Sequence, residues 1–430
     1  MMPVGPRVLV LGSIVLLIVA LTISPAIADR LLESPAYPTT VERDPTPPLP
    51  TIPGGPTKWF QPGPDGVQRL LPQDAFLRVR GWIDGGYTYN SSSPPSHFNG
   101  PYNAIDRDIG QFNQLYLIID KPLADTSRLD VGGRMDLLWG YDYYLAQSSA
   151  LERREDGSQH WNHNQYGFAI PQAYAEVGNK TWSFKLGHFY TIIGYEGVPA
   201  LNNFFYSKAY SYQFAGPFTH WGGIGTWNLD QHWTVQGGVV NGWNSLSSTH
   251  NEAAVLGKVT YTASQNLWAV SFAFITGDEP AAEANTFDTR TRLSTIITVR
   301  PLDRLEYVFH HYYAYQENGT TGGGTARWYG IDQYLYYTIT KIWRAGLRFE
   351  WFRDENGTRV GGAADRGNVN LAPFPGSFYS LSAGVNYRPH PNVLIRPEVR
   401  SDWFDGTGLP YNDRNDTHQY LLAVDASLQF

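Results

Sequence analysis

Residues 128–144 read RLDVGGRMDLLWGYDYY, and apolar or aromatic side chains recur at every second position of this stretch. The intervening positions carry charge, at Asp130, Arg134, Asp136 and Asp142. An α-helix separates residues with a period of 3.6, whereas an extended strand places alternate residues on opposite faces. The stretch therefore predicts a β-strand with one apolar face and one ionic face.

The same alternation recurs to the end of the chain. In IWRAGLRFEWF, residues 342–352, Trp343, Leu347 and Phe349 alternate with charged residues. Sixteen strands are predicted in this way, and most are long enough to cross a bilayer, which takes about 9–11 tilted residues. They cover residues 76–89, 112–120, 129–143, 168–177, 181–190, 219–228, 232–242, 252–262, 267–276, 289–299, 304–316, 327–339, 342–352, 377–387, 392–404 and 419–430.

The connections between these strands indicate which solvent the apolar face meets. Alternation alone also fits a soluble β-sandwich. However, short connections such as GNK and RPHP alternate with long ones, as in barrels with short periplasmic turns and long outer loops. In a hydrocarbon layer, every backbone group of a sheet finds a partner only if the sheet is closed. We therefore expect an all-β, closed antiparallel transmembrane β-barrel of about 16 strands, with a third loop folded inward.

Composition agrees with strands and excludes some functions. The chain has 28 Tyr, 14 Trp, 21 Phe and 43 Gly but 3 Met, a mixture that favours strands and turns. It has no Cys, which excludes disulfides, thiolate metal sites and a cysteine nucleophile. The net charge is −7, and no basic stretch is dense enough for a nucleic-acid partner.

The first 74 residues differ from the rest. Arg7 precedes an apolar run over 8–23, and Ala26 and Ala28 follow, which predicts a cleaved signal peptide over 1–28. An uncleaved membrane anchor is the alternative. Residues 29–74 are dense in Pro and predict an extended or disordered periplasmic arm, either a spacer or a plug that enters the barrel. The barrel would cover 75–430 and lie in the bacterial outer membrane.

One region also resembles a known family. The segments KLGHFYTIIGYE, NNFFYS, GPFTHWG and VQGGVVNGW resemble the OmpL-like family of outer-membrane beta-barrel porins. The resemblance is most specific over 184–243 and extends more loosely over 75–430. It implies a barrel fold and passive passage of solutes, and it supplies neither a substrate nor functional residues.

The third long connection, residues 191–218, is unusually aromatic. Its many apolar side chains disfavour a loop that is fully exposed to water. In sixteen-stranded porins, the third outer loop bends inward and narrows the channel. We therefore expect this loop to form the constriction; an outer cap or a subunit contact is the alternative. The candidate constriction residues are Tyr195, Glu196, Phe205, Tyr206, Lys208 and Tyr210.

The ionic faces of the strands predict the lining of the lumen. Barrels of 16 to 18 strands leave an aqueous channel, so small hydrophilic solutes are the expected partners. The basic residues near both chain ends would either form a positive wall that favours anions or pair with neighbouring acids and stiffen the wall. The candidate lumen charges are Arg78, Arg80, Arg134, Asp136, Lys185, Arg344, Arg348, Glu350, Arg396 and Arg400.

The chain ends in QYLLAVDASLQF, residues 419–430, with an aromatic residue as its last. This alternating end resembles the carboxy-terminal signature that the barrel assembly machinery reads, which makes Phe430 a candidate assembly signal. Closure also requires this strand to pair with the first one. Outer-membrane lipid would surround the barrel, and a homotrimer is an open alternative to a monomer.

Enzymatic motifs are missing from the sequence. The chain contains no G-x-S-x-G, H-E-x-x-H or P-loop pattern. The His pairs at 160/163 and at 310/311 have spacings that give only weak support for a metal site. We therefore predict no catalytic residue, cofactor or metal, and a porin function. A β-rich surface carbohydrate-binding protein and an outer-membrane enzyme are the alternatives.

Overall fold

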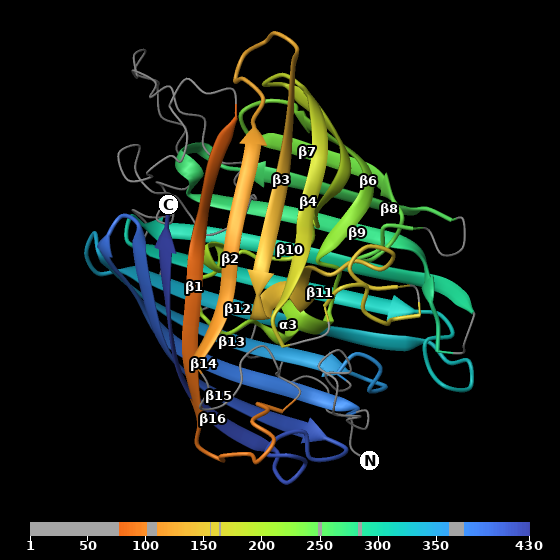
Figure 1. Cartoon of the computed structure of the whole chain (residues 1–430), viewed down its shortest axis with the longest axis vertical. Coiled ribbons are helices and arrows are strands. Elements are labelled where there is room, and N and C mark those ends of the chain that lie inside the picture. The colour runs from red at the N-terminus through yellow and green to blue at the C-terminus, as the bar shows by residue number, and fades with distance from the viewer. Residues whose placement is uncertain are drawn as a thin grey trace.

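The computed structural model describes residues 77–100, 110–154, 156–162, 165–247, 252–282, 286–360 and 374–430. These residues form one antiparallel sheet in which each strand pairs with its neighbours in sequence (Figure 1). Strand β1 also pairs with β16, so the sheet is a closed barrel of sixteen strands. The predicted closed antiparallel β-barrel of about 16 strands is confirmed. The predicted signal peptide over 1–28 and the Pro-rich arm over 29–74 lie outside the described residues.

The strands are long, as a tilted membrane-crossing barrel requires. They are β1 Arg78–Asn90, β2 Gly110–Lys121, β3 Asp130–Gly140, β4 Gly167–Gly178, β5 Trp182–Tyr190, β6 Thr219–Asn228, β7 Trp233–Val240, β8 Ala254–Thr262, β9 Trp268–Pro280, β10 Phe287–Leu302, β11 Leu305–Gln316, β12 Ala326–Thr338, β13 Trp343–Asp354, β14 Gly376–His390, β15 Val393–Gly406 and β16 His418–Gln429. The short helical segments are η2 Tyr141–Ala146, η3 Ala200–Asn202, α3 Tyr210–Phe214 and η4 Ser264–Asn266. No helix within the described residues has the length and apolarity needed to cross a membrane.

The barrel closes at the seam between β1 and β16. Trp82 lies opposite Gln429, and the pairing continues to Asn90 opposite Leu421. Beyond β16, the Phe430 backbone exchanges two hydrogen bonds with Gly81, at 2.8 and 2.9 Å. The last residue therefore completes the ladder, and neither terminal strand keeps an open edge.

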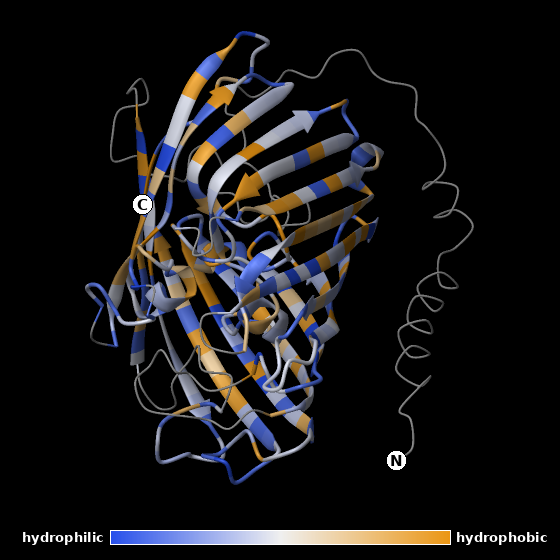
Figure 2. Ribbon diagram, turned by 90° about the vertical axis from the view of Figure 1, so that its right-hand side faces the viewer, coloured by the Kyte–Doolittle hydropathy of each residue, from blue (hydrophilic) through white to orange (hydrophobic). Residues whose placement is uncertain are grey.

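Side chains alternate between the outer surface and the interior along each strand. On β13, Leu347 is 49% exposed, whereas the neighbouring Arg348 is fully buried. The same apolar-out pattern holds on β3, where Val131, Met135 and Trp139 are exposed. Figure 2 shows the resulting alternation of hydrophobic and hydrophilic segments along the strands. The outer surface is therefore suited to acyl chains, and the polar residues line the interior.

The strand predicted over 129–143 ends earlier than expected. It stops at Gly140, whose φ is +147° and where a Cβ atom would lie 2.2 Å from the Asn113 carbonyl oxygen. The chain turns there into η2, and Tyr141 and Tyr143 become buried instead of lying in an interfacial girdle. Only glycine tolerates both this conformation and this close approach.

The connections follow the expected alternation with one exception. Those after the odd-numbered strands are generally the longer ones, as residues 191–218 and 355–375 show. The turn over 122–129, however, is longer than the opposite connection over 281–286. Strands β9 and β10 extend further toward this connection than the sequence predicted, which shortens it.

The outward face of β13 supplies a test of the membrane orientation. Replacing Leu347 by Arg places a charge near the middle of the apolar band and should cost about 2–4 kcal/mol of folding free energy. The matched variant Leu302→Arg, at the exposed end of β10, should cost about 0–1 kcal/mol. Equilibrium folding into phospholipid vesicles in urea measures both, and equal losses would contradict the orientation.

Candidate functional site

The loop over residues 191–218 connects β5 to β6 and turns toward the barrel interior. Its base is closed by a hydrogen bond of 2.9 Å from Thr191 N to the Phe218 carbonyl oxygen. It contains η3 and α3, and Figure 1 shows α3 surrounded by the strands. Further contacts connect it to inward-facing side chains of β2, β8, β12, β13 and β15. The loop therefore crosses the lumen.

The segment around η3 is anchored to strands from both ends of the chain. Gln114 of β2 accepts a hydrogen bond from Ala200 N at 3.0 Å and donates one to the Val198 carbonyl oxygen at 2.8 Å. From β15, Arg396 Nη1 donates to the carbonyl oxygens of Ala200 and Asn203 at 2.7 and 2.8 Å. The loop therefore bridges β2 and β15, on either side of the β1–β16 seam.

Arg348 of β13 is the centre of a second anchor. It is fully buried and donates from Nη1 to Glu196 Oε1 at 2.9 Å and from Nη2 to Ser207 Oγ at 2.6 Å. Ser207 N in turn donates to Glu398 of β15 at 2.9 Å. Glu350 Oε1 lies 2.9 Å from Arg348 Nε. Breaking one member of such a buried network leaves an uncompensated charge, which costs about 3–5 kcal/mol.

Helix α3 packs against β12 and β13. The Tyr210 backbone N–H donates to Glu350 Oε2 at 2.6 Å, and Trp328 Nε1 donates to the Ala215 carbonyl oxygen at 3.1 Å. Both wall residues are fully buried. Because these bonds fix the two ends of α3, the helix is held against the wall by polar contacts in addition to apolar packing.

Glycines in the wall make room for aromatic side chains of the loop. A Cβ atom on Gly346 would lie 2.4 Å from the Phe204 ring, closer than side-chain carbons approach one another. The glycines therefore act as sockets that let the rings lie directly on the sheet. The three ring–socket pairs are Phe204 on Gly346, Phe205 on Gly384 and Tyr206 on Gly86.

The candidate lumen arginines lie on the inward faces and are paired with acids. The ion pairs are Arg78 and Arg80 with Asp120, Arg134 with Asp136, Arg344 with Glu306, Arg348 with Glu196 and Glu350, Arg396 with Asp425, and Arg400 with Glu350 and Asp402. Lys185 differs, since its Nζ lies 4.2 Å from the centre of the Tyr174 ring. The arginines of this wall thus have acidic neighbours rather than standing as isolated positive charges.

The loop covers the wall unevenly. Gln172, Phe189 and Ile224 on β4 to β6 are buried, like the charges of β12 to β15, whereas the inward-facing residues closer to the short turns of β4 to β7 are half-buried. They include Glu176, Lys185, Thr226 and Gln236, and the last two are joined by a hydrogen bond of 3.2 Å. Solvent therefore reaches the part of the interior next to these short turns.

Sequence reasoning missed several residues that hold the loop. Asp332 lies opposite Glu350 in the register of β12 and β13, so the alternation that identified Glu350 could also have found it. Gln114 is neutral, and Ser207 lies within the loop, so neither carries a periodic signal. The candidate Lys208 donates to the Gly197 carbonyl oxygen at 3.3 Å within the loop itself. Among the described residues, no group of His, Asp and Glu has the geometry of a metal site.

Burial shifts the pKa values of three groups in the connections. It raises the pKa of Asp142 in η2 to about 7, although Lys208 and a hydrogen bond from Gln114 act in the opposite direction. Burial also raises the pKa of Glu196 against the effect of Arg348. It lowers the pKa of Lys208, which Asp142 and Glu196 partly oppose. The interior next to the loop is therefore poorly solvated.

A closed sixteen-stranded barrel with an apolar exterior and a polar interior is the architecture of an outer-membrane porin. The model of the family described as "Putative beta-barrel porin-2, OmpL-like" matches residues 77–430, and the chain belongs to this family. The resemblance found in the sequence is thereby confirmed. Family and fold together support an outer-membrane location.

Solved porin structures share the fold. The outer membrane channel DcaP of Acinetobacter baumannii has a TM-score of 0.54 at 15% identity, over 82% of this chain and 97% of that one. OmpT of Vibrio cholerae has a TM-score of 0.53 at 11% identity, over 84% of this chain and 100% of that one. An anion-selective porin from Comamonas acidovorans has a TM-score of 0.52 at 10% identity, over 82% of this chain and 99% of that one. No curated protein matches the chain. At these identities the likeness extends to the fold alone.

The glycine sockets predict a matched pair of variants. Gly346→Ala places a methyl group 2.4 Å from the Phe204 ring and should loosen the loop, whereas Gly237→Ala meets no atom within 4 Å. Limited proteolysis of the folded protein should therefore cut the loop at least several-fold faster in Gly346→Ala only. Equal protection in both variants would contradict the packing of this ring on the wall.

The raised pKa of Asp142 predicts a pH dependence of stability. The folded state binds this proton more tightly than the unfolded chain, so the contribution is fully present below about pH 4 and is lost as the pH rises to about 7. Asp142→Asn should therefore raise the temperature of the heat-induced gel-mobility shift at pH 8 and have no effect at pH 4.

Asp230 serves as the control with the opposite sign. It lies in the turn between β6 and β7, where hydrogen bonds from Trp233 and His232 lower the pKa of its carboxyl. Asp230→Asn should leave the folding stability unchanged at low pH, where the carboxyl is protonated in both states, and lower it at pH 8. If Asp142→Asn also lowers stability at pH 8, burial does not govern the Asp142 carboxyl.

Proposed function

We propose that the protein is an outer-membrane porin that lets small hydrophilic solutes diffuse passively through a water-filled bore. The observation that carries this proposal is the loop over 191–218, which crosses the lumen and is fixed to the wall at Gln114, Arg348 and Arg396. A barrel of sixteen strands is wide enough for an aqueous channel unless something fills it. The anchored loop would narrow this bore and leave water beside the half-buried inward-facing residues of β4 to β7.

The proposal does not include enzymatic activity. The acids of the barrel interior hold arginines or loop groups, as Glu350 does with Arg400 at 3.0 Å and with Tyr210 N at 2.6 Å. Nor does it include a carbohydrate-binding surface, because the aromatic rings of the loop pack on the wall rather than facing solvent. Phe204 and Phe205, for example, are both buried.

The partners of the proposed porin follow from the same geometry. Lipid would cover the apolar exterior, and the barrel assembly machinery would act on the chain end, where Phe430 pairs with Gly81. One solved OmpT structure is described as a trimer form. For this chain a homotrimer fits the outward face of β13 to β16, where the small residues Ala345 and Ala383 line a shallow apolar hollow.

Deleting part of the loop tests the constriction directly. Removing residues 199–215 should increase the single-channel conductance in planar bilayers at least about twofold, because the segment that crosses the lumen is lost. A matched deletion of residues 319–324, in the outer connection between β11 and β12, should leave the conductance unchanged.

Two results would oppose the proposal. A wild-type protein that inserts into bilayers without conducting would exclude a diffusion channel. A loop-deleted protein that keeps the wild-type conductance would show that the loop does not limit passage. Liposome-swelling rates with uncharged sugars give an independent measure of the same bore.

A further inference from the structure

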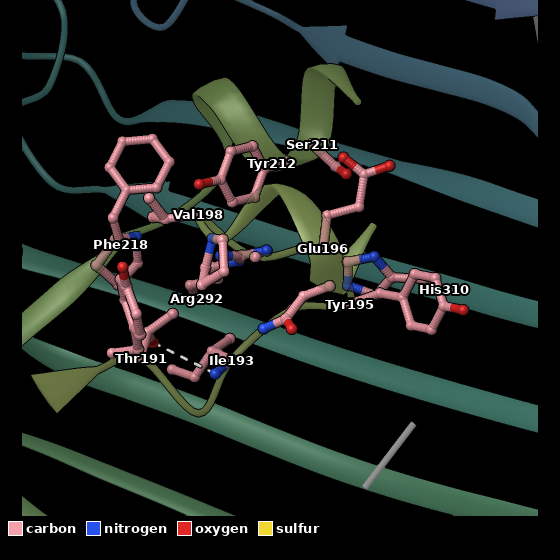
Figure 3. A pocket seen from close by; sticks show the side chains of 16 residues that line it. Thr191, Ile193, Tyr195, Glu196, Val198, Ser211, Tyr212, Phe218, Arg292 and His310 are labelled. Carbon is pink, nitrogen blue, oxygen red and sulfur yellow. Dashed lines mark hydrogen bonds between the residues drawn. The ribbon is translucent and has the colours of Figure 1, made fainter. Parts of the chain in front are cut away.

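A cavity lies between the loop over 191–218 and the wall formed by β10 and β11. The loop supplies most of its lining, and Tyr190 of β5, Arg292 of β10 and His310 of β11 complete it. Figure 3 shows the Arg292 side chain among Ile193, Val198 and Tyr212 of the loop. The centres of water molecules can occupy about 40 Å³ of the cavity, which is room for a few waters or one small polar group.

Arg292 is the unusual residue of this cavity. Its side chain is buried, yet no described residue forms an ion pair with it or a hydrogen bond with its Nε. The inward-facing Arg344, Arg348 and Arg396, by contrast, all have carboxylate partners. A guanidinium that is buried without a carboxylate in contact is costly, so a ligand that supplies an oxyanion at contact distance should bind there.

The acids nearest in the architecture are already engaged. Glu196, which also lines the cavity, accepts hydrogen bonds from Arg348 and from Tyr334 at 2.9 and 3.1 Å. Asp332 of β12 accepts hydrogen bonds through Oδ2 from Ser211 and from His310 Nδ1. These contacts occupy Glu196 and one oxygen of Asp332, and neither carboxylate forms an ion pair or a hydrogen bond with Arg292.

The loop is shaped around the Arg292 guanidinium. A Cβ atom on Gly216 would lie 1.4 Å from Arg292 Nη1, and one on Gly194 would lie 3.5 Å from Nη2. Gly194 also has a φ of +103°, which favours glycine. Two glycines therefore let the loop backbone approach the cation while keeping side chains out of the space beside it.

A second cation stands close to the cavity. Lys258 of β8 is buried and donates from Nζ to the Ile192 carbonyl oxygen at 3.1 Å, next to the cavity-lining Ile193. In the sheet register Lys258 lies opposite Ala273, which lies opposite Ser294. Lys258 is thus two strands from β10, about 10 Å away by strand spacing. Its charge adds to the attraction for an anion.

We propose that Arg292 and the surrounding loop form a binding subsite for a small oxyanion group, a carboxylate or a phosphate, carried by a permeating solute. The inference rests on the proposed porin function for its role in passage, but binding itself does not require conduction. A planar carboxylate matches the paired N–H donors of a guanidinium. The size of the cavity admits such a group and not a whole large solute.

Equilibrium binding to the detergent-solubilised full-length protein tests the subsite. Isothermal titration calorimetry with sodium acetate and, separately, inorganic phosphate should detect binding of at least one probe to wild type. Arg292→Gln should weaken that binding at least tenfold. Arg300→Gln removes a positive charge from the same face of the same strand, where Arg300 pairs with Glu306 at 2.7 Å, and should bind as wild type does.

A second variant keeps the charge and covers the case in which Arg292→Gln does not fold. Gly216→Ala puts a methyl group where Arg292 Nη1 lies and should abolish binding without changing the net charge. If wild type binds neither probe, or if Arg292→Gln and Gly216→Ala bind as wild type does, the subsite is refuted. An equal loss in Arg300→Gln would reduce the effect to general charge and also refute it.

Bilayer recordings separate this outcome from the porin proposal. A protein that conducts but does not bind acetate or phosphate retains the porin function and loses the subsite. A protein that binds either probe through Arg292 but does not conduct retains the subsite and loses the porin function. The difference between the two probes identifies which oxyanion the cavity prefers.

Discussion

The whole architecture depends on the need of backbone N–H and C=O groups for partners where water is absent. In a hydrocarbon layer a sheet meets this need only by closing on itself. Here the closing ladder runs from Trp82 opposite Gln429 to Asn90 opposite Leu421, and Gly81 and Phe430 extend it by two bonds. Once the ring is closed, strict alternation sends every second side chain inward, which fixes the composition of the interior.

The barrel interior therefore contains many charged side chains and little water to solvate them. On β13 and β15, arginines and acids alternate with outward apolar residues, so closure brings them into one compartment. They compensate one another in pairs, as Arg396 does with Asp425, and the loop adds its own acid, Glu196, to Arg348. The loop is therefore part of the electrostatic balance of the wall as well as an obstacle in the bore. Arg292 stands out because no described carboxylate forms an ion pair with it.

Sequence reasoning found the fold because the fold depends on a local, periodic property. The period of two, visible in residues 128–144 and 342–352, predicted sixteen strands, and the alternation of short and long connections predicted that they form a closed antiparallel barrel. The prediction failed at Tyr141, because the backbone conformation of Gly140 ends the strand there. The alternation of apolar and polar residues contains no information about the φ angle of one glycine. The period of two also assigns a side chain to one face of the sheet, but it does not identify the residue that this side chain contacts. Hence Arg348 could be placed inward, but its contact with Ser207 of the loop could not be foreseen.

The bridge that the loop makes between β2 and β15 bears on the order of assembly. Gln114 and Arg396 hold the same short segment from strands that are synthesised early and late in the chain. The segment cannot take up both sets of bonds until the last strands have arrived beside the first. Seating of the loop must therefore be a late event, and a nascent barrel that has not yet joined its ends should be wider than the mature one.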